Sequence, residues 1–200
     1  QLEELGVFLA KNEKELTKEQ KGDALRAINL ITEKRDGRIK GRTVADGSVQ
    51  KGLYEKSQTA SPTISTDALL ISLIVDAHEK RDVAVADVVA AYLKADMSDY
   101  TLLKFTGESV DIMCKMNPKY KEYVTTESGK KVLYVQLLKA LYGCVVSALL
   151  WYELFSGHLK EMGFEINPYD SCIANKLING KQCTIAWYVD DMKISHVSKV

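Results

Sequence analysis

The chain has 200 residues, of which 46% are hydrophobic, so it is long enough to bury a core in one or two domains. Its 27 basic and 27 acidic side chains cancel, which argues against a protein that simply coats nucleic acid. A polymerase is still compatible with this balance, because it holds strands in a local groove and needs acidic side chains for metal. The apolar runs stay below the roughly 18 residues of a membrane span.

The cysteines contain no C-x-x-C pair, so a zinc site is not expected. They are Cys114, Cys144, Cys172 and Cys183. No secretory signal is visible at the start of the chain, and we therefore expect reduced thiols in an intracellular protein. Gln1 is not an ordinary first residue, and the chain stops directly after a strand-like run. We expect a piece of a longer protein.

The first third of the chain is expected to combine helices with short strands. Residues 1–35 are rich in Glu and Lys, and their apolar spacing indicates one amphipathic helix. Residues 36–61 show little apolar periodicity and predict short strands and loops. A second helix follows, for which Ser65 or Thr66 can form the N-cap. Its expected apolar face consists of Leu69, Leu70, Leu73, Ile74 and Ala77.

Strand and helix signals alternate in the rest of the chain. Residues 83–89 have the composition of a buried strand, with Asp87 inside it. Residues 101–105 and 132–137 are further strand candidates, and residues 147–162 show helical spacing. These signals predict an α+β fold, with a small antiparallel sheet and helices packed on one face.

The last thirty residues contain two chain reversals. Asn179-Gly180, between two apolar runs, is a strong hairpin signal. Asp190-Asp191 forms the second reversal, so these carboxylates lie at the tip or shoulder of a hairpin. Neighbouring carboxylates repel each other unless a cation such as Mg²⁺ is present. The alternative is a solvated turn, because Asp is common in turns.

Asp87 is a candidate third carboxylate for this site. An unpaired carboxylate within an apolar strand costs several kcal/mol. A salt bridge, or a strand end that reaches solvent, would explain it. If Asp87 instead meets Asp190 across adjacent strands, the three carboxylates can hold two metal ions about 4 Å apart for in-line phosphoryl transfer. Spacing alone leaves both explanations open.

Longer strings around these aspartates resemble one known family. Tyr188-Val-Asp-Asp191 resembles the tyrosine–x–aspartate–aspartate box of reverse transcriptases, and residues 87–93 resemble their first aspartate motif. Residues 138–152 are similar to the signature around the template-positioning glycine of copia-type elements, and residues 34–47 to the fingers segment. Because four blocks occur in family order, the resemblance is far more specific than one short box. The chain resembles the reverse transcriptase of copia-type retrotransposons.

The resemblance implies an α+β, right-hand polymerase fold made of fingers and palm. Its small antiparallel palm sheet would be backed by helices, and the thumb would be absent. Residues 1–33 would form a divergent N-terminal helical segment. Residues 34–200 would form the reverse transcriptase fingers and palm, truncated before the thumb and the RNase H region.

The resemblance also implies the catalytic centre. Asp87, Asp190 and Asp191 would be the catalytic carboxylates and would hold two Mg²⁺ ions, with Mn²⁺ as a substitute. The backbone carbonyl of Val88 would be a further metal ligand. In the implied reaction, a primer 3′-hydroxyl attacks the α-phosphate of an incoming dNTP and releases pyrophosphate.

Further residues of the matching blocks would bind the nucleotide. Tyr92 would be a steric gate that selects deoxyribonucleotides, although a core aromatic is the more usual role of a Tyr. Lys40 and Arg42 would pair with the triphosphate, whereas their alternative role is that of solvated loop cations. Gly143 would let the backbone approach the nascent base pair closely.

Three departures from the family pattern support an alternative. Val146 and Ala148 stand where copia-type elements carry a Gln and a Pro, and Asp46 stands where they carry an Arg. Residues 1–33 lack a Trp-rich opening. The alternative is a catalytically silent remnant that acts as a nucleic-acid-binding or assembly module. A nucleotidyl cyclase would share the palm sheet but not the Leu-Tyr-Gly…Trp-Tyr block.

The partners implied by the resemblance are a primed RNA or DNA template, dNTPs and the rest of a Pol polyprotein, including integrase and RNase H. No membrane is implied. The implied location is the cytoplasm, in virus-like particles.

Overall fold

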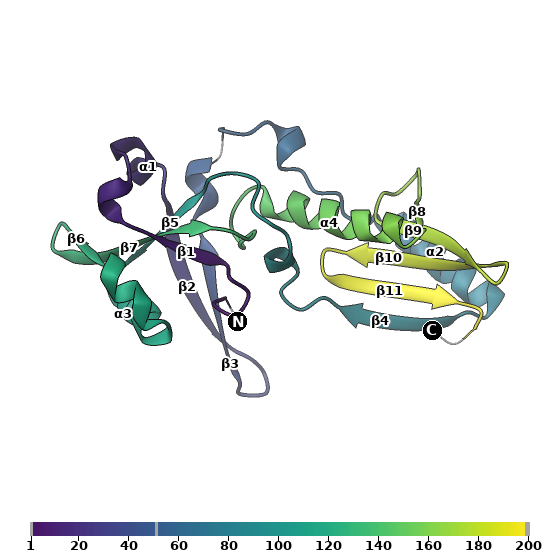
Figure 1. Cartoon of the computed structure of the whole chain (residues 1–200). Coiled ribbons are helices and arrows are strands. Elements are labelled where there is room, and N and C mark those ends of the chain that lie inside the picture. The colour runs from purple at the N-terminus through teal and green to yellow at the C-terminus, as the bar shows by residue number, and fades with distance from the viewer. Residues whose placement is uncertain (1, 51, 199–200) are drawn as a thin grey trace. The chain divides into compact units, whose positions relative to one another are not determined.

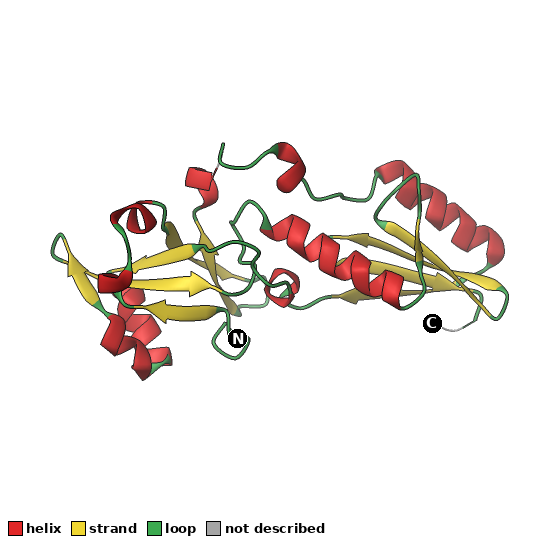
Figure 2. Cartoon of the chain, turned by 45° about the horizontal axis from the view of Figure 1, so that its top comes forward, coloured by secondary structure: helices red, strands yellow, loops and turns green. Residues whose placement is uncertain are grey.

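The computed structural model describes residues 2–50 and 52–198. Its fold is α+β, as predicted, and its elements form two units that interleave in the sequence (Figures 1 and 2). Unit 1 comprises Gln1–Thr59 and Tyr92–Leu150, and unit 2 comprises Ala60–Ala91 and Trp151–Val200. The expected division into residues 1–33 and 34–200 has no counterpart in these units, because no unit boundary falls between residues 33 and 34. Residues 199–200 lie outside the described residues.

Unit 1 is built on a six-stranded sheet in the order β1-β7-β5-β2-β3, with β6 paired to β7. Its strands are β1 (Phe8–Lys11), β2 (Leu25–Glu33), β3 (Ile39–Ala45), β5 (Leu102–Thr106), β6 (Thr125–Glu127) and β7 (Lys130–Leu137). Its helices are α1 (Lys18–Gly22) and α3 (Glu108–Met116). β2 and β5 run parallel, so this sheet is mixed rather than antiparallel. Its core contains the fully buried Leu103, Phe105 and Leu133.

The single amphipathic helix predicted for residues 1–35 is wrong. β1, the short helix α1 and strand β2 occupy this region, so it is not a helical segment. Thr17 and Gln20 cap α1 reciprocally, each side chain accepting a hydrogen bond from the other residue's backbone N–H. β2 pairs with β3 along its length from Ala27 onward, and Leu25 is buried against β5. Pairing with the following strand β3 and with the distant strand β5 outweighs the local helical spacing here.

Unit 2 is built on a five-stranded antiparallel sheet in the order β4-β11-β10-β9-β8. Its strands are β4 (Asp82–Asp87), β8 (Glu165–Ile166), β9 (Ile173–Ile178), β10 (Lys181–Tyr188) and β11 (Asp191–His196). The hairpin predicted at Asn179-Gly180 is confirmed, because both residues have positive φ and Ile178 pairs with Lys181.

Two long helices cover opposite faces of the unit 2 sheet, α2 (Thr66–Glu79) and α4 (Ser147–Glu161) (Figure 2). From α4, Leu159 packs in a cluster with Ile185 of β10. On the α2 side, Arg81 donates a hydrogen bond to Thr184, the preceding residue of the same strand. Successive strand side chains point to opposite faces, so the prediction that helices pack on one face is wrong for unit 2.

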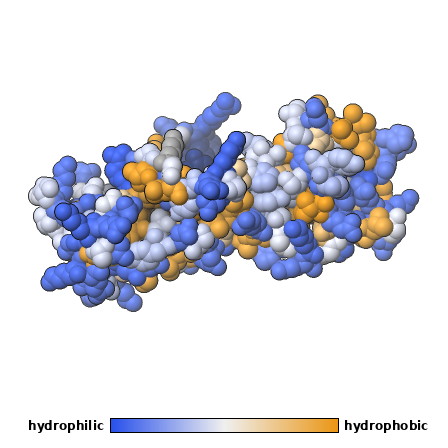
Figure 3. Space-filling model, turned by 90° about the horizontal axis from the view of Figure 1, so that it is seen from above, coloured by the Kyte–Doolittle hydropathy of each residue, from blue (hydrophilic) through white to orange (hydrophobic). Residues whose placement is uncertain are grey.

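The apolar stripe predicted for α2 is not the face that meets the sheet. Ser72 and Asp76 are buried there, whereas Leu70, Leu73 and Ile74 are 52%, 43% and 68% exposed. Figure 3 shows such apolar side chains at the surface of unit 2. The predicted N-cap is confirmed, since the Ser65 side chain accepts a hydrogen bond from the Ala68 N–H.

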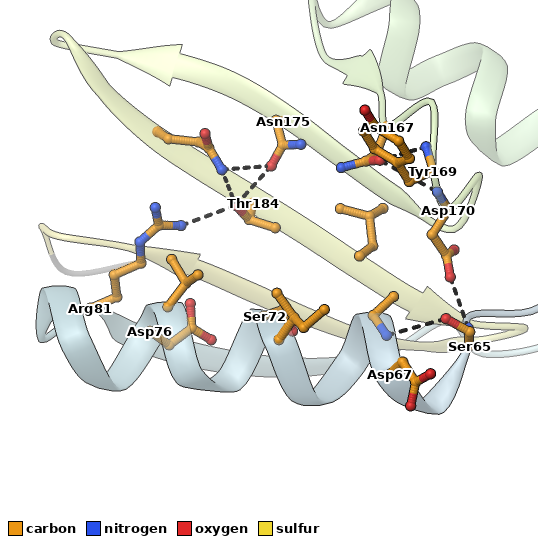
Figure 4. A pocket seen from close by; sticks show the side chains of 15 residues that line it. Ser65, Asp67, Ser72, Asp76, Arg81, Asn167, Tyr169, Asp170, Asn175 and Thr184 are labelled. Atoms are coloured by element: carbon orange, nitrogen blue, oxygen red, sulfur yellow. Dashed lines mark hydrogen bonds between the residues drawn. The ribbon is translucent and has the colours of Figure 1, made fainter.

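A cavity of about 440 Å³ lies between α2 and strands β9 and β10 (Figure 4). At one end, the Thr184 hydroxyl accepts hydrogen bonds from Arg81 and Gln182 and donates one to Asn175. The Arg81 guanidinium also forms an ion pair with Glu79. These polar contacts, rather than leucines, join α2 to the sheet.

The four cysteines are buried and form no disulfide with one another. Across residues 2–50 and 52–198, no helix is long and apolar enough to cross a bilayer.

Candidate active site

The turn between β10 and β11 carries the predicted acidic pair. Tyr188 and Asp191 are directly opposite each other, so the two turn residues are Val189 and Asp190. The reversal therefore lies one residue earlier than predicted, and Asp191 begins a strand. Val189 has a φ of 57°, which is uncommon for a β-branched residue because its Cβ crowds the backbone. Strain of this kind costs of order 1–3 kcal/mol and is concentrated at functional sites.

The three predicted aspartates lie at one end of the unit 2 sheet. Asp87 is the last residue of β4 and lies directly opposite Asp191 of β11. Cross-strand neighbours of this kind have Cβ atoms about 4.5–5.5 Å apart. Asp190 is tied to the same strand end through its backbone, because its carbonyl accepts a hydrogen bond of 2.9 Å from the Val88 N–H. The strand partner of Asp87 is thus Asp191, not Asp190.

The aspartates are accessible rather than buried. β4 is an edge strand, Val85 is 79% exposed and Asp87 is exposed, so the prediction of a buried strand is wrong. Among the residues that the structure describes, Asp87, Asp190 and Asp191 form no ion pair. Their negative charges are therefore not neutralised by a neighbouring cationic side chain.

The aspartate side chains do not converge on one point. Within the described parts of the chain, no three His, Cys, Asp or Glu side chains lie close enough together to hold a metal ion. The donor set nevertheless suits a hard divalent cation, which binds carboxylate and carbonyl oxygens. Holding such an ion requires rotation of the aspartate side chains, and the exposure of Asp87 and Asp191 leaves room for it.

Trp151 of α4 anchors the acidic turn from the other side of the sheet. Its indole Nε1–H donates a hydrogen bond of 2.7 Å to the carbonyl of Val189. Its ring is 5% exposed and stacks on Phe155, with ring centroids 5.4 Å apart. Sequence reasoning missed this contact. The one sequence signal for this contact was the presence of a Trp in the predicted helix that follows the glycine block.

Lys40 and Arg42 lie in unit 1, on strand β3 opposite Thr32 and Leu30. They are two residues apart, so their side chains project from the same face of the β2–β3 hairpin. Both are exposed. In the parts of the chain that are described, neither forms an ion pair, so two cationic groups are available side by side.

Gly143 and Tyr92 also belong to unit 1, where Gly143 packs against Ala45 at the end of β3 and Tyr92 contacts the neighbouring Tyr142. Gly143 has a φ of 95°, and a Cβ there would lie 1.9 Å from the Ala45 carbonyl oxygen. The Ala45 N–H donates to the carbonyl of Tyr142, whose ring lies 4.6 Å from that of Tyr92. Packing against β3 is therefore sufficient to require glycine at position 143.

Asp46, one of the departures from the family pattern, has local partners. It forms an ion pair of 3.2 Å with Arg26 on the neighbouring strand, and it accepts hydrogen bonds from the N–H and hydroxyl of Ser48. These Ser48 hydrogen bonds, and then the Arg26 charge, lower the pKa of its carboxyl. Val146, another departure from the family pattern, is buried and therefore contributes to the core.

Comparison with known proteins places these features in one family. Residues 16–199 match the sequence model of the family described as reverse transcriptase (RNA-dependent DNA polymerase). The chain is 30% identical over 174 residues to the Transposon Ty1-BL Gag-Pol polyprotein of Saccharomyces cerevisiae, and equally to the Ty1-LR2 polyprotein. This similarity covers 85% of the chain but 9% of each polyprotein. The chain therefore belongs to the reverse transcriptase (RNA-dependent DNA polymerase) family, as a domain of the copia type.

Proposed function

We propose that the chain contributes the fingers and palm of an RNA-directed DNA polymerase, with unit 2 as the palm and unit 1 as the fingers. The observation that carries this proposal is the pairing of Asp87 with Asp191 beside the strained turn that contains Asp190. Family membership supports the reaction class. Because the chain spans 9% of its curated relatives, the activity itself is a proposal for this chain.

The catalytic carboxylates in this proposal are Asp87, Asp190 and Asp191. Together with the backbone carbonyl of Val88, they would hold two Mg²⁺ ions, for which Mn²⁺ can substitute. When bound, the ions supply positive charge at the attacking and leaving oxygens of phosphoryl transfer. The protein supplies the rigid strand ends that carry the ligands, through the β4–β11 pairing and the Val88 to Asp190 hydrogen bond.

Unit 1 would supply the contacts to the incoming nucleotide. Lys40 and Arg42 project from one face of β3 without ion-pair partners among the described residues, which suits binding of a triphosphate. Tyr92 would act as the gate against a 2′-hydroxyl. Gly143 would let the backbone come close to the nascent base pair, in addition to its packing against Ala45.

Primer extension with matched variants tests the proposal. The chain, with Mg²⁺, poly(rA)–oligo(dT) and dTTP, should extend the primer. Asp190→Asn keeps the side-chain size but removes a charged ligand, and it should lower the extension rate by at least about 10³-fold. Asp82→Asn, on an exposed residue at the other end of β4, is the control and should retain the rate. Equal extension by both variants would show that the catalytic assignment is wrong.

A catalytically silent nucleic-acid-binding or assembly module is the second candidate. Asp46 and the lack of converging metal ligands among the described residues favour it. Binding of Mn²⁺, followed by electron paramagnetic resonance, distinguishes the two functions. Saturable binding at millimolar Mn²⁺ that is lost when all three aspartates become Asn supports the polymerase. Absence of binding supports the silent module.

We also propose a setting for this activity. The domain would act within a Pol polyprotein that contains integrase and RNase H, on a primed RNA or DNA template, in cytoplasmic virus-like particles. The two relatives compared above are Gag-Pol polyproteins of transposons, which supports this setting.

A further inference from the structure

The backbone of the acidic turn is held from two directions. The carbonyl of Val189 accepts a hydrogen bond from the Trp151 indole of α4, and the carbonyl of Asp190 accepts one from the Val88 N–H at the end of β4. Both turn carbonyls therefore have a donor outside the hairpin. Neither contact involves a carboxylate, so the aspartate side chains stay available for ligands.

A second hairpin of the same sheet shows why these contacts matter. The β9–β10 turn contains Asn179 and Gly180, which adopt positive φ readily. The β10–β11 turn instead places the β-branched Val189 at a φ of 57°. Val disfavours this conformation, so surrounding contacts must determine it. The indole hydrogen bond acts on the peptide carbonyl of Val189 itself.

Trp151 is well placed to impose this geometry because its own ring is fixed. The indole stacks on Phe155 at 5.4 Å, and Phe155 meets Trp187 edge to face at 5.2 Å. Trp187 lies two residues before Val189 on β10. A rigid aromatic cluster thus joins α4 to the strand that leads into the acidic turn.

We propose that Trp151 is a positioning residue for the catalytic turn. Its indole N–H holds the strained Val189 peptide and thereby fixes the backbone of Asp190 relative to Asp87 and Asp191. This inference rests on the proposed polymerase function for its kinetic consequence but not for its structural one. Trp151 need not touch the substrate.

The test replaces one N–H by one sulfur atom. Incorporating 3-benzothienylalanine at position 151 keeps the shape of the ring but removes the donor. We expect the turnover number to fall roughly 10–100-fold, because misplacing a catalytic group by about 1 Å costs on this order. The KM for dTTP and the thermal unfolding midpoint should stay close to the wild-type values. The same replacement at Trp187, a ring of the same cluster, is the matched control and should leave turnover unchanged.

A crystal structure of the position-151 variant gives a readout that is independent of activity. A change of the Val189 φ to negative values, or a displaced Asp190 backbone, supports the inference. A retained positive φ overturns it, as does unchanged turnover in an active protein. If the wild-type chain extends no primer, the proposed function fails, and the φ of Val189 in the variant alone decides on Trp151.

Discussion

The two faces of the unit 2 sheet are built in different ways. The α4 face is a dense apolar cluster in which Leu159, Ile185 and Trp187 are buried. The α2 face joins helix to sheet through polar contacts around a cavity of about 440 Å³. Asp191 is two residues from Lys193, which binds Asp76 of α2, so Asp191 and its partner Asp87 project on the α2 side. The dense face therefore fixes the backbone, while the looser face carries the carboxylates.

The largest expected effect concerns the buried ion pair of the α2 face. Asp76 and Lys193 are both largely buried and paired with each other. Asp76→Ala leaves the lysine charge without its partner and should lower the free energy of unfolding by about 3–5 kcal/mol, measured by urea denaturation. The double variant Asp76→Leu, Lys193→Met should recover most of this loss.

Asp67→Ala is the control for this prediction, because Asp67 is exposed in the first turn of the same helix. It should cost at most about 1 kcal/mol, through the helix dipole. If Asp76→Ala is equally mild, the ion pair does not hold α2 on the sheet. The claim that polar contacts stabilise the α2 face would then be wrong.

The next effect compares apolar deletions on the two faces. Leu159→Ala should lower the free energy of unfolding by about 3 kcal/mol, because it leaves a void in a close-packed cluster. Ile71→Ala, on the exposed wall of the α2 cavity, should cost less than about 1 kcal/mol. Urea denaturation of both variants measures the difference. Equal losses would mean that the two faces are packed alike.

The last effect is a pH dependence, confined to alkaline pH, that originates in the α4 cluster. Burial, and then the charge of Asp170, raises the pKa of the Cys172 thiol to about 12. An unfolded thiol has a pKa of about 8.5, so the folded state retains its proton more tightly. The resulting stabilisation of the folded state is fully present below about pH 8.5 and is lost as the pH rises toward 12.

Comparison with Cys172→Ala isolates this contribution. Between pH 9 and 12 the free energy of unfolding of the wild type should fall more steeply than that of the variant. Iodoacetamide at pH 8 should also label Cys172 far more slowly in the folded chain than in urea. Equally fast labelling would show that the α4 face opens readily.

Local signals in the sequence were sufficient for several elements. Asn179-Gly180 carries its own preference for positive φ, and the Ser65 cap and the spacing over residues 147–162 each act within one helix. These elements were predicted correctly because the determining residues are neighbours in the chain. The strand β7 was found for the same reason, since Val132–Val135 form a continuous run of apolar and aromatic residues that are all buried.

Contacts with other segments of the chain explain the failures. β2 was mistaken for a helix because its partners, β3 and β5, determine its conformation. The apolar stripe of α2 was assigned to the core because leucines usually face inward. The strands that face α2, however, present the polar side chains Thr184 and Lys193. Asp76 forms an ion pair with Lys193, and Arg81 donates a hydrogen bond to Thr184. Side-chain periodicity alone does not reveal the polarity of a partner surface.

The candidate site was predicted in its residues but not in its geometry. The resemblance to a known family led to Asp87, Asp190 and Asp191, and the structure brings all three to one end of a sheet. The register, with Asp191 rather than Asp190 opposite Asp87, depends on where the turn falls. The Trp151 contact depends on how α4 packs, which one sequence does not encode in any local pattern.

The strand order of unit 2 has a consequence for synthesis on the ribosome. Among the described strands, β4 pairs with β11 alone, and β11 begins 104 residues after β4 ends (Asp87 to Asp191). At ~5–20 residues per second, the valine-rich β4 waits roughly 5–20 s without its partner. During this interval an unpaired apolar strand is exposed to other nascent chains, so chaperone capacity should limit the yield of soluble domain more than its final stability does.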